Sequence, residues 1–266
     1  MAGTRLARTQ GTRAPDDGPG TPGMPSVKSA ERTVRVLEYL AASPVPRTLR
    51  DVQRELALPR SSAYALLLTL VRCGWVETDH TGSRFRLGVR ALSTGASYIE
   101  QDDMVQRAAQ AMDDLSARLG ETIHLARLEG AEIVYLATRP SRHSLGVNFR
   151  PGRRLPSYVT ALGKALLSER TAEEVEALLP QPLTPLTPNT ITEMPGLHRE
   201  LRLTRERGYA IDNEESTEGI RCFAVPLRRS ALPLDAISCV VPLARLAPNQ
   251  EQEIVQALQE AQRLLS

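Results

Sequence analysis

Arginine and hydroxyl side chains gather at two places in the first third of the chain. Arg60, Ser61 and Ser62 stand at the start of a helical pattern, and Arg84 and Arg86 alternate along a strand-like stretch. Guanidinium groups donate to phosphates and to base edges, and hydroxyl groups can donate or accept there, so this chemistry suits DNA. The candidates for DNA contact are Arg32, Thr48, Arg60, Ser61, Ser62, Tyr64, Arg84 and Arg86.

Three helical patterns position most of these side chains. The first begins at Ser29, which we expect to cap it, and the second begins after a Thr48 cap. The third begins near Arg60 and is stopped by Gly74, since glycine favours helix ends. The short turn between the second and third helices predicts a helix-turn-helix.

A β-hairpin is expected after the third helix. Residues 75–79 and 84–87 alternate apolar and polar side chains on either side of the turn 80–83. Three helices followed by such a wing predict a winged helix-turn-helix DNA-binding domain over residues 26–88.

Charge is divided unevenly along the 266 residues, which are 41% hydrophobic and 24% charged. Residues 26–90 hold eleven Lys and Arg against six Asp and Glu, whereas residues 91–266 hold nineteen against twenty-three. A basic segment joined to an acidic remainder indicates one part that meets a polyanion and a second part with another task. Residues 1–25 are rich in Gly and Pro and predict a disordered tail, with Met1 or Met24 as the true start.

The remainder predicts a linker helix and an α+β domain. Val89, Leu92, Ala96 and Ile99 recur at helical spacing, so we expect a linker helix over residues 89–103 that can pair with its copy in a dimer. Antiparallel strand patterns and inserted helices then predict an α+β domain. Its expected elements are helices at 104–119, 157–169, 172–179, 192–207 and 249–265, and strands at 122–128, 132–138, 221–227 and 235–242.

Catalytic, metal and membrane roles find no support in the sequence. Cys73, Cys222 and Cys239 have no C-x-x-C spacing, which indicates a reducing, cytoplasmic location. No His-Glu metal helix and no glycine-rich phosphate loop occurs, and the longest apolar run is too short to span a bilayer. No signal peptide pattern is present. We therefore expect a protein that is not an enzyme and uses no cofactor, no metal and no membrane.

Eight short motifs follow one another in a fixed order. They are 26–32 (SVKSAER), 58–62 (LPRSS), 85–88 (FRLG), 152–156 (GRRLP), 160–167 (TALGKALL), 208–209 (GY), 212–215 (DNEE) and 219–222 (GIRC). In these motifs the chain resembles the IclR-type bacterial transcriptional regulators from about residue 26 to residue 266. The resemblance implies a winged helix joined by a linker helix to a GAF-like effector-binding domain at 104–266, and a homodimer or homotetramer on palindromic operators.

The resemblance also implies a pocket for a small organic acid. The matching positions are Ala161, Leu162, Asp212, Cys222 and Ser238. Two residues depart from the family pattern. Val240 stands where some members have a second serine, which implies a less polar ligand or fewer hydrogen bonds, and Ala65 replaces a commonly basic residue of the recognition helix.

The residue types of this pocket are compatible with an acid but leave other interpretations open. A segment entering a helix near Thr160 leaves backbone N–H groups for a carboxylate, and Asp212 and Ser238 can bond a ligand hydroxyl. Equally, Cys222 can be a small buried hydrophobe, Ser238 can bond its own sheet, and Asp212 can start a turn.

We therefore expect a ligand-responsive DNA-binding transcriptional regulator, with repression favoured, whose operator affinity depends on a small carboxylate bound in the second domain. The alternative is a winged-helix adaptor or protein-interaction module with a ligand-binding domain and no specific operator. Salt distinguishes the two, because phosphate contacts release counterions and an apolar protein interface does not.

Overall fold

The computed structural model describes residues 27–144, 146–147, 149–228 and 232–266. The chain divides into two compact units, with the boundary between Ala96 and Ser97. The predicted disordered tail at 1–25 lies outside the described residues. Within the described part, no helix is both long and apolar enough to cross a membrane.

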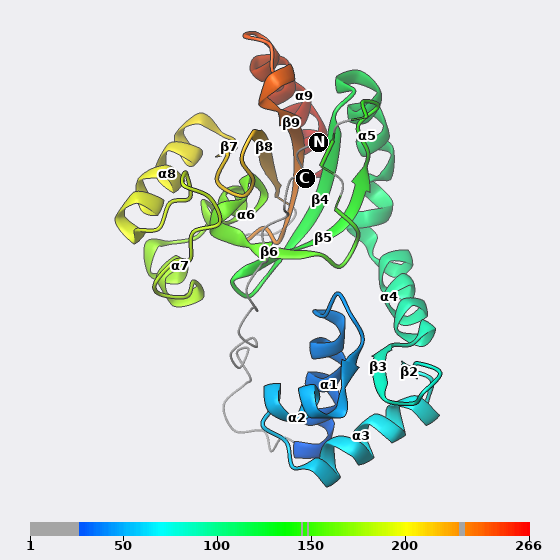
Figure 1. Ribbon diagram of the computed structural model, residues 1–266. Helices are drawn as coiled ribbons and strands as arrows, with labels where there is room; N and C mark the ends of the chain where they lie inside the picture. The colour runs from blue at the N-terminus through cyan, green and yellow to red at the C-terminus, as the bar shows by residue number, and fades with distance from the viewer. Residues whose placement is uncertain (1–26, 145, 148, 229–231) are drawn as a thin grey trace, which may run out of the picture. The chain divides into compact units, whose positions relative to one another are not determined.

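The first unit is a three-helix bundle with a small sheet (Figure 1). Val36, Val52, Ala63 and Leu67 are fully buried at its centre, which explains the helical spacing of the apolar residues. The antiparallel sheet has the strand order β1-β3-β2. The elements are α1 (Lys28–Ala41), β1 (Arg47–Thr48), α2 (Leu49–Glu55), α3 (Arg60–Arg72), β2 (Val76–Thr78) and β3 (Arg84–Leu87). The predicted winged helix-turn-helix is confirmed.

The ends of these helices test the predicted caps. Thr48 caps α2 as predicted, and Gly74 follows α3 with a φ of 75°, a left-handed conformation that suits glycine. The prediction for Ser29 was wrong. Val27 is the N-cap of α1, and Ser29 already lies inside the helix, where its backbone is committed to the first turn.

Two consecutive helices follow the wing. The helix α4 (Val89–Gln101) has no buried residue. The next helix, α5 (Asp103–Leu119), is capped by the side chain of Asp102, which accepts a hydrogen bond of 3.1 Å from the backbone N–H of Val105.

A six-stranded antiparallel sheet forms the second unit, with the strand order β6-β5-β4-β9-β8-β7. The strands are β4 (Thr122–Glu129), β5 (Glu132–Arg139), β6 (Arg154–Pro156), β7 (Ala210–Asn213), β8 (Ile220–Leu227) and β9 (Asp235–Pro242). The four long strands match the predicted ones, whereas the short strands β6 and β7 at the two edges were not predicted. The α+β class is confirmed.

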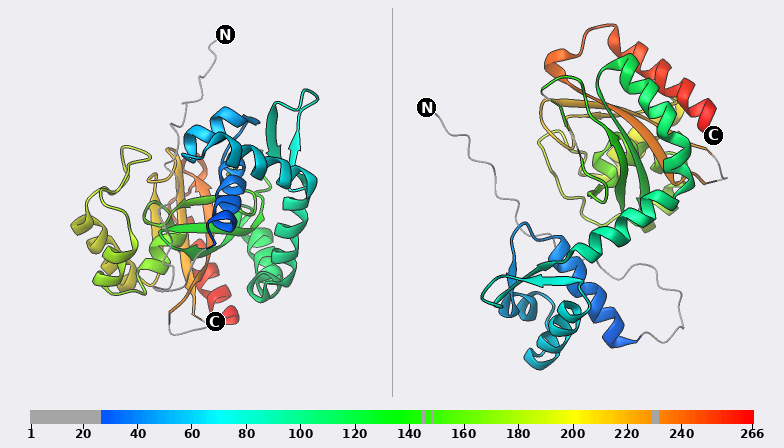
Figure 2. Two further views of the ribbon diagram at one scale, coloured as in Figure 1. Left: turned by 90° about the horizontal axis from the view of Figure 1, so that it is seen from below. Right: turned by 90° about the vertical axis from the view of Figure 1, so that its right-hand side faces the viewer.

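Helices cover both faces of this sheet (Figures 1 and 2). One face carries α5 and α9 (Gln250–Leu265), and the other carries α6 (Ala161–Leu167). The remaining elements are the 3-10 turns η1 (Ser157–Val159) and η2 (Leu243–Arg245), with α7 (Ala172–Leu178) and α8 (Met194–Arg207). The single helix predicted at 157–169 is broken, because Thr160 is extended and caps α6 by accepting from the N–H of Gly163.

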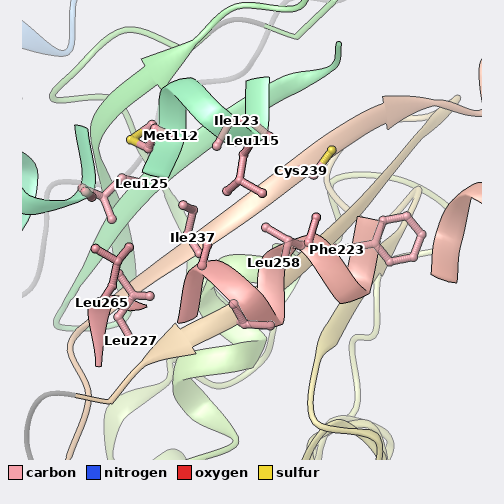
Figure 3. Close-up of a cluster of buried hydrophobic side chains, with 14 of the residues drawn as sticks. Met112, Leu115, Ile123, Leu125, Phe223, Leu227, Ile237, Cys239, Leu258 and Leu265 are labelled. Atoms are coloured by element: carbon pink, nitrogen blue, oxygen red, sulfur yellow. The ribbon is translucent and has the colours of Figure 1, made fainter. Parts of the chain in front are cut away.

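The alternation of the strands separates two apolar clusters. Phe223 points toward α9 and α5, where Figure 3 shows Met112, Leu115 and Leu258 packed against Ile237. The neighbouring residues of β8 point the other way, toward α6. The first cluster is a closed core, and the second contains the candidate site.

Candidate functional site

A small cavity lies between α6 and the sheet. All five residues predicted for the effector pocket line it, namely Ala161, Leu162, Asp212, Cys222 and Ser238. Its volume is about 10 Å3, which is about the space that one water molecule needs on this measure. Side chains must therefore move apart before an organic acid fits.

Strand register explains why residues distant in sequence meet here. Asp212 of β7 is directly opposite Cys222 of β8, and Cys222 is opposite Val240 of β9. Directly opposed residues share one face of a sheet. Ser238 lies two residues before Val240 and therefore points to the same face.

Aromatic side chains form a wall that sequence reasoning missed. The rings of Tyr135 and Phe149 line the cavity, with centroids 4.8 Å apart in an edge-to-face arrangement. The guanidinium carbon of Arg153 lies 4.5 Å from the centroid of Phe149. Alternation along β5 was a usable signal for Tyr135, whereas Phe149 lies outside any regular strand.

Asp212 is buried and its carboxylate holds a turn together. Its Oδ1 accepts from the backbone N–H groups of Glu215 at 2.7 Å and Ser216 at 3.3 Å, and its Oδ2 accepts from the Ser216 hydroxyl at 2.5 Å. Burial raises the pKa of Asp212, and the Ser216 hydrogen bond and the charge of Lys164 oppose that rise. Asp212 thus both starts a turn and lines the cavity, so the two interpretations of its role coexist.

A buried ion pair adjoins Asp212 through Glu215, whose backbone N–H donates to the Asp212 carboxylate. The ammonium of Lys164 is fully buried and contacts Oε1 of Glu215. Burial also raises the pKa of Glu215, against the opposing effect of Lys164. Neither residue was predicted, because nothing in the spacing of residues 164 and 215 indicates that the chain brings them together.

Ser238 and Cys222, two further predicted residues, differ in chemistry. Ser238 is buried, and its Oγ has no hydrogen-bond partner among the described residues. Its side chain therefore does not bond its own sheet. Burial raises the pKa of the Cys222 thiol well above its ordinary value, so this cysteine is a neutral, apolar part of the wall rather than a nucleophile.

The candidate DNA surface lies at the start of α3 and on the wing. Arg60 and Ser61 are exposed, Ser62 is partly buried, and Tyr64 is 50% exposed. Arg32 on α1 is partly exposed.

The wing presents its arginines on an ordered hairpin. Arg84 and Arg86 are both exposed, and Arg86 pairs with Glu77 across the strands at 3.0 Å. The carboxylate of Asp79 accepts from the backbone N–H groups of Ser83 and Arg84, which fixes the turn.

Thr48 differs from the other candidates because both its donors are engaged. Its backbone N–H and its hydroxyl donate to Oδ2 of Asp51 at 3.0 and 2.7 Å. Its hydroxyl oxygen also accepts from the Asp51 N–H, which completes a capping box. The side chain therefore positions α2.

Across residues 27–144, 146–147, 149–228 and 232–266, no group of three or more His, Cys, Asp or Glu side chains is placed to hold a metal ion.

Known proteins match both units. Residues 29–80 match the IclR helix-turn-helix domain, and residues 96–266, more than half of the chain, match the bacterial transcriptional regulator IclR C-terminal domain. The transcriptional regulator XynR of Escherichia coli K12 is 33% identical over 236 residues, covering 86% of this chain and 94% of that protein.

Solved structures agree in fold. A transcriptional regulator from Rhodococcus sp. RHA1 superposes with a TM-score of 0.76 at 30% identity, covering 90% of this chain and 97% of that one. An IclR homolog from Microbacterium hydrocarbonoxydans, complexed with 4-hydroxybenzoate, has a TM-score of 0.73 at 27% identity, with coverages of 89% and 97%.

The matched domains belong to transcription factors, so the prediction that this protein is not an enzyme is confirmed. The helix-turn-helix and the C-terminal domain occur in the family's order and span nearly all described residues. The chain belongs to the IclR family of bacterial transcriptional regulators.

Proposed function

We propose that this DNA-binding transcriptional regulator changes its operator affinity when a small organic acid occupies the cavity beside α6, and that it acts as a repressor in the cytoplasm. The observation that carries the proposal is the convergence of Ala161, Leu162, Asp212, Cys222 and Ser238 on one cavity with a buried, unpartnered hydroxyl. The 4-hydroxybenzoate complex of the Microbacterium homolog supports a carboxylate as the ligand class.

For DNA, we propose that α3 enters the major groove and the wing contacts the phosphate backbone. The residues proposed to contact bases and phosphates in the groove are Arg60, Ser61, Ser62 and Tyr64. The exposure of Arg60, Ser61 and Tyr64 on the first turns of α3 supports this role. Arg84 and Arg86 would bind phosphates, as would Arg32. Thr48 would act indirectly, through the cap of α2.

We propose a network around Arg127 as the link between the cavity and α4. Arg127 donates to Asp235 at 2.7 Å, to Asp102 at 2.6 Å and to the hydroxyl of Tyr98 on α4 at 2.8 Å. Asp235 begins β9, three residues before Ser238 of the cavity. A ligand that displaces β9 would thus shift the contacts that hold the end of α4.

We also propose that two copies pair through α4. Its apolar side chains Val89 and Leu92 are 69% and 72% exposed, and Ala96 lies on the same stripe. Burying such a stripe against its copy removes apolar surface from water. The proposed parts of each copy are then the DNA-binding residues 26–88, the linker 89–103 and the effector domain 104–266.

The test is fluorescence anisotropy with DNA flanking the protein's own gene and with a scrambled duplex, each at two salt concentrations. We expect selective binding that weakens steeply with salt. Arg60→Ala should weaken operator binding and spare ligand binding, while Arg202→Ala, an exposed arginine of α8, should change neither. Folded protein without selectivity at either salt would favour the adaptor function instead.

A further inference from the structure

Two unpartnered polar atoms belong to neighbouring residues of the sheet: Ser238 lines the cavity, and His124 lies beside it in the adjacent strand. Nε2 of His124 and Oγ of Ser238 are buried, and neither has a hydrogen-bond partner among the described residues. His124 of β4 is directly opposite Ser238 of β9, so both side chains share the face that carries the cavity. The imidazole also packs against two rings of the cavity wall. Its centroid lies 4.9 Å from that of Tyr135 and 5.5 Å from that of Phe149.

A hydrogen-bond chain decides which nitrogen of His124 carries the proton. The hydroxyl of Thr138 donates to the backbone carbonyl of Phe149 at 2.7 Å, and Nδ1 of His124 lies 2.9 Å from the same hydroxyl oxygen. Because the single Thr138 proton is used at the carbonyl, its oxygen accepts from Nδ1–H. A neutral imidazole has one N–H, so Nε2 is left as a bare acceptor.

Burial keeps this imidazole neutral. Burial lowers the pKa of His124 to about 4, and a hydrogen bond with the backbone of Val147 opposes that shift. At neutral pH this face of the sheet therefore carries one atom that can only accept, on the residue opposite a cavity-lining serine whose hydroxyl can donate or accept.

These two atoms have a definite complement. A ligand hydroxyl can donate to Nε2 and accept from the Ser238 hydroxyl, which satisfies both buried groups at once. A keto or carboxylate oxygen has no proton to offer and would meet the Nε2 lone pair, leaving that nitrogen unsatisfied. We propose that His124, positioned by Thr138 and acting with Ser238, selects small organic acids that carry a hydroxyl group over the matching oxo acids, dicarboxylates and unsubstituted acids. The proposal rests on the effector function proposed for this cavity.

Isothermal titration of the full chain with matched acids tests this selectivity. The probes are 4-hydroxybenzoate against benzoate and terephthalate, and lactate against pyruvate. Within any set that binds, we expect the hydroxy acid to bind about tenfold more tightly, which corresponds to about 1.4 kcal/mol.

Variants assign the preference to its residues. His124→Phe keeps a ring for packing and removes the acceptor, and Ser238→Ala removes the hydroxyl, so each should reduce the preference to about twofold or less. His198→Phe, a histidine of α8 bonded to Glu176, serves as the control and should keep it.

A measurement without ligand tests the proton position. Long-range proton–nitrogen NMR should show His124 as the Nδ1–H tautomer between pH 5.5 and 8. Thr138→Val should shift it toward the Nε2–H tautomer and weaken the hydroxyl preference, a change that a purely packing role for His124 would not produce.

The outcomes separate the two proposals. Binding of acids without preference, an unchanged preference in His124→Phe, or an Nε2–H tautomer in the unaltered protein would overturn the selectivity while leaving the effector site standing. No binding of any acid to folded protein that shows the Nδ1–H tautomer would overturn the effector function, and the selectivity with it.

Discussion

At the scale of single residues, His124 links folding to acidity. Its pKa falls from 6.5 to about 4 on folding, so the unfolded chain takes up a proton in an interval where the folded one does not. Stability is therefore lost as the pH falls from about 6.5 to 4, by up to about 3 kcal/mol. In urea titrations followed by circular dichroism, His124→Phe should lose less stability over that interval; parallel losses in both proteins would contradict the burial argument.

Asp212 should respond in the opposite direction. Burial raises its folded pKa above the ordinary 3.8, so the folded chain holds the proton longer than the unfolded chain. The protonated carboxyl therefore stabilises the fold, and this contribution falls as the pH rises from about 3.8 through the raised pKa of the folded chain. Relative to the unaltered protein, Asp212→Asn should become more stable between pH 4 and pH 7 in the same urea assay. A difference that does not depend on pH would mean that folding leaves this carboxyl's proton affinity unchanged.

The five pocket residues were predictable through family resemblance, and they do meet at one cavity. His124 was not predictable, because its place opposite Ser238 depends on the pairing of β4 with β9, and Phe149 was not because it lies outside any regular strand. Such register is set by packing across the sheet, which local spacing does not reveal.

At the scale of elements, substitutions of Thr48 at the cap of α2 test whether this residue stabilises the fold or contacts DNA directly. Thr48→Ala removes the capping box and should destabilise the first unit by about 1 kcal/mol, while Thr48→Ser should retain most of it. The single tryptophan, Trp75, packs on the core of this unit, so its fluorescence reports the unfolding. Unaltered stability together with lost operator binding in Thr48→Ala would make Thr48 a direct DNA contact.

The bounds of long amphipathic helices and long strands were predicted nearly to the residue, because many apolar side chains in each element repeat with the same period. The two-residue strand β1 and the edge strands β6 and β7 are too short to show alternation. The break at Thr160 was missed for a related reason. One extended residue between two helical turns changes the hydrogen bonds of the backbone and barely alters the apolar spacing.

At the scale of the whole molecule, the proposed coupling is reciprocal. If an acid changes operator affinity by about 5- to 150-fold, the operator must change the affinity for the acid by the same factor. Tyr98→Phe removes the Arg127 contact to α4 while leaving the ion pairs of Arg127 in place. Anisotropy with and without acid should then show that this variant still binds the operator and the acid, but that the acid changes operator affinity by a smaller factor. An unchanged factor would exclude the contact between Tyr98 and Arg127 from the coupling.

The small volume of the cavity bears on the concentration at which the proposed regulator would respond to an acid. A space of about one water molecule must be opened before it is filled, so only the open fraction of molecules can take up the acid. The apparent dissociation constant is the intrinsic one divided by that fraction, and an open fraction of about 1% raises it about a hundredfold. If the proposed acid binds in this cavity, a pocket that must first open shifts the response of the regulator toward higher concentrations of that acid.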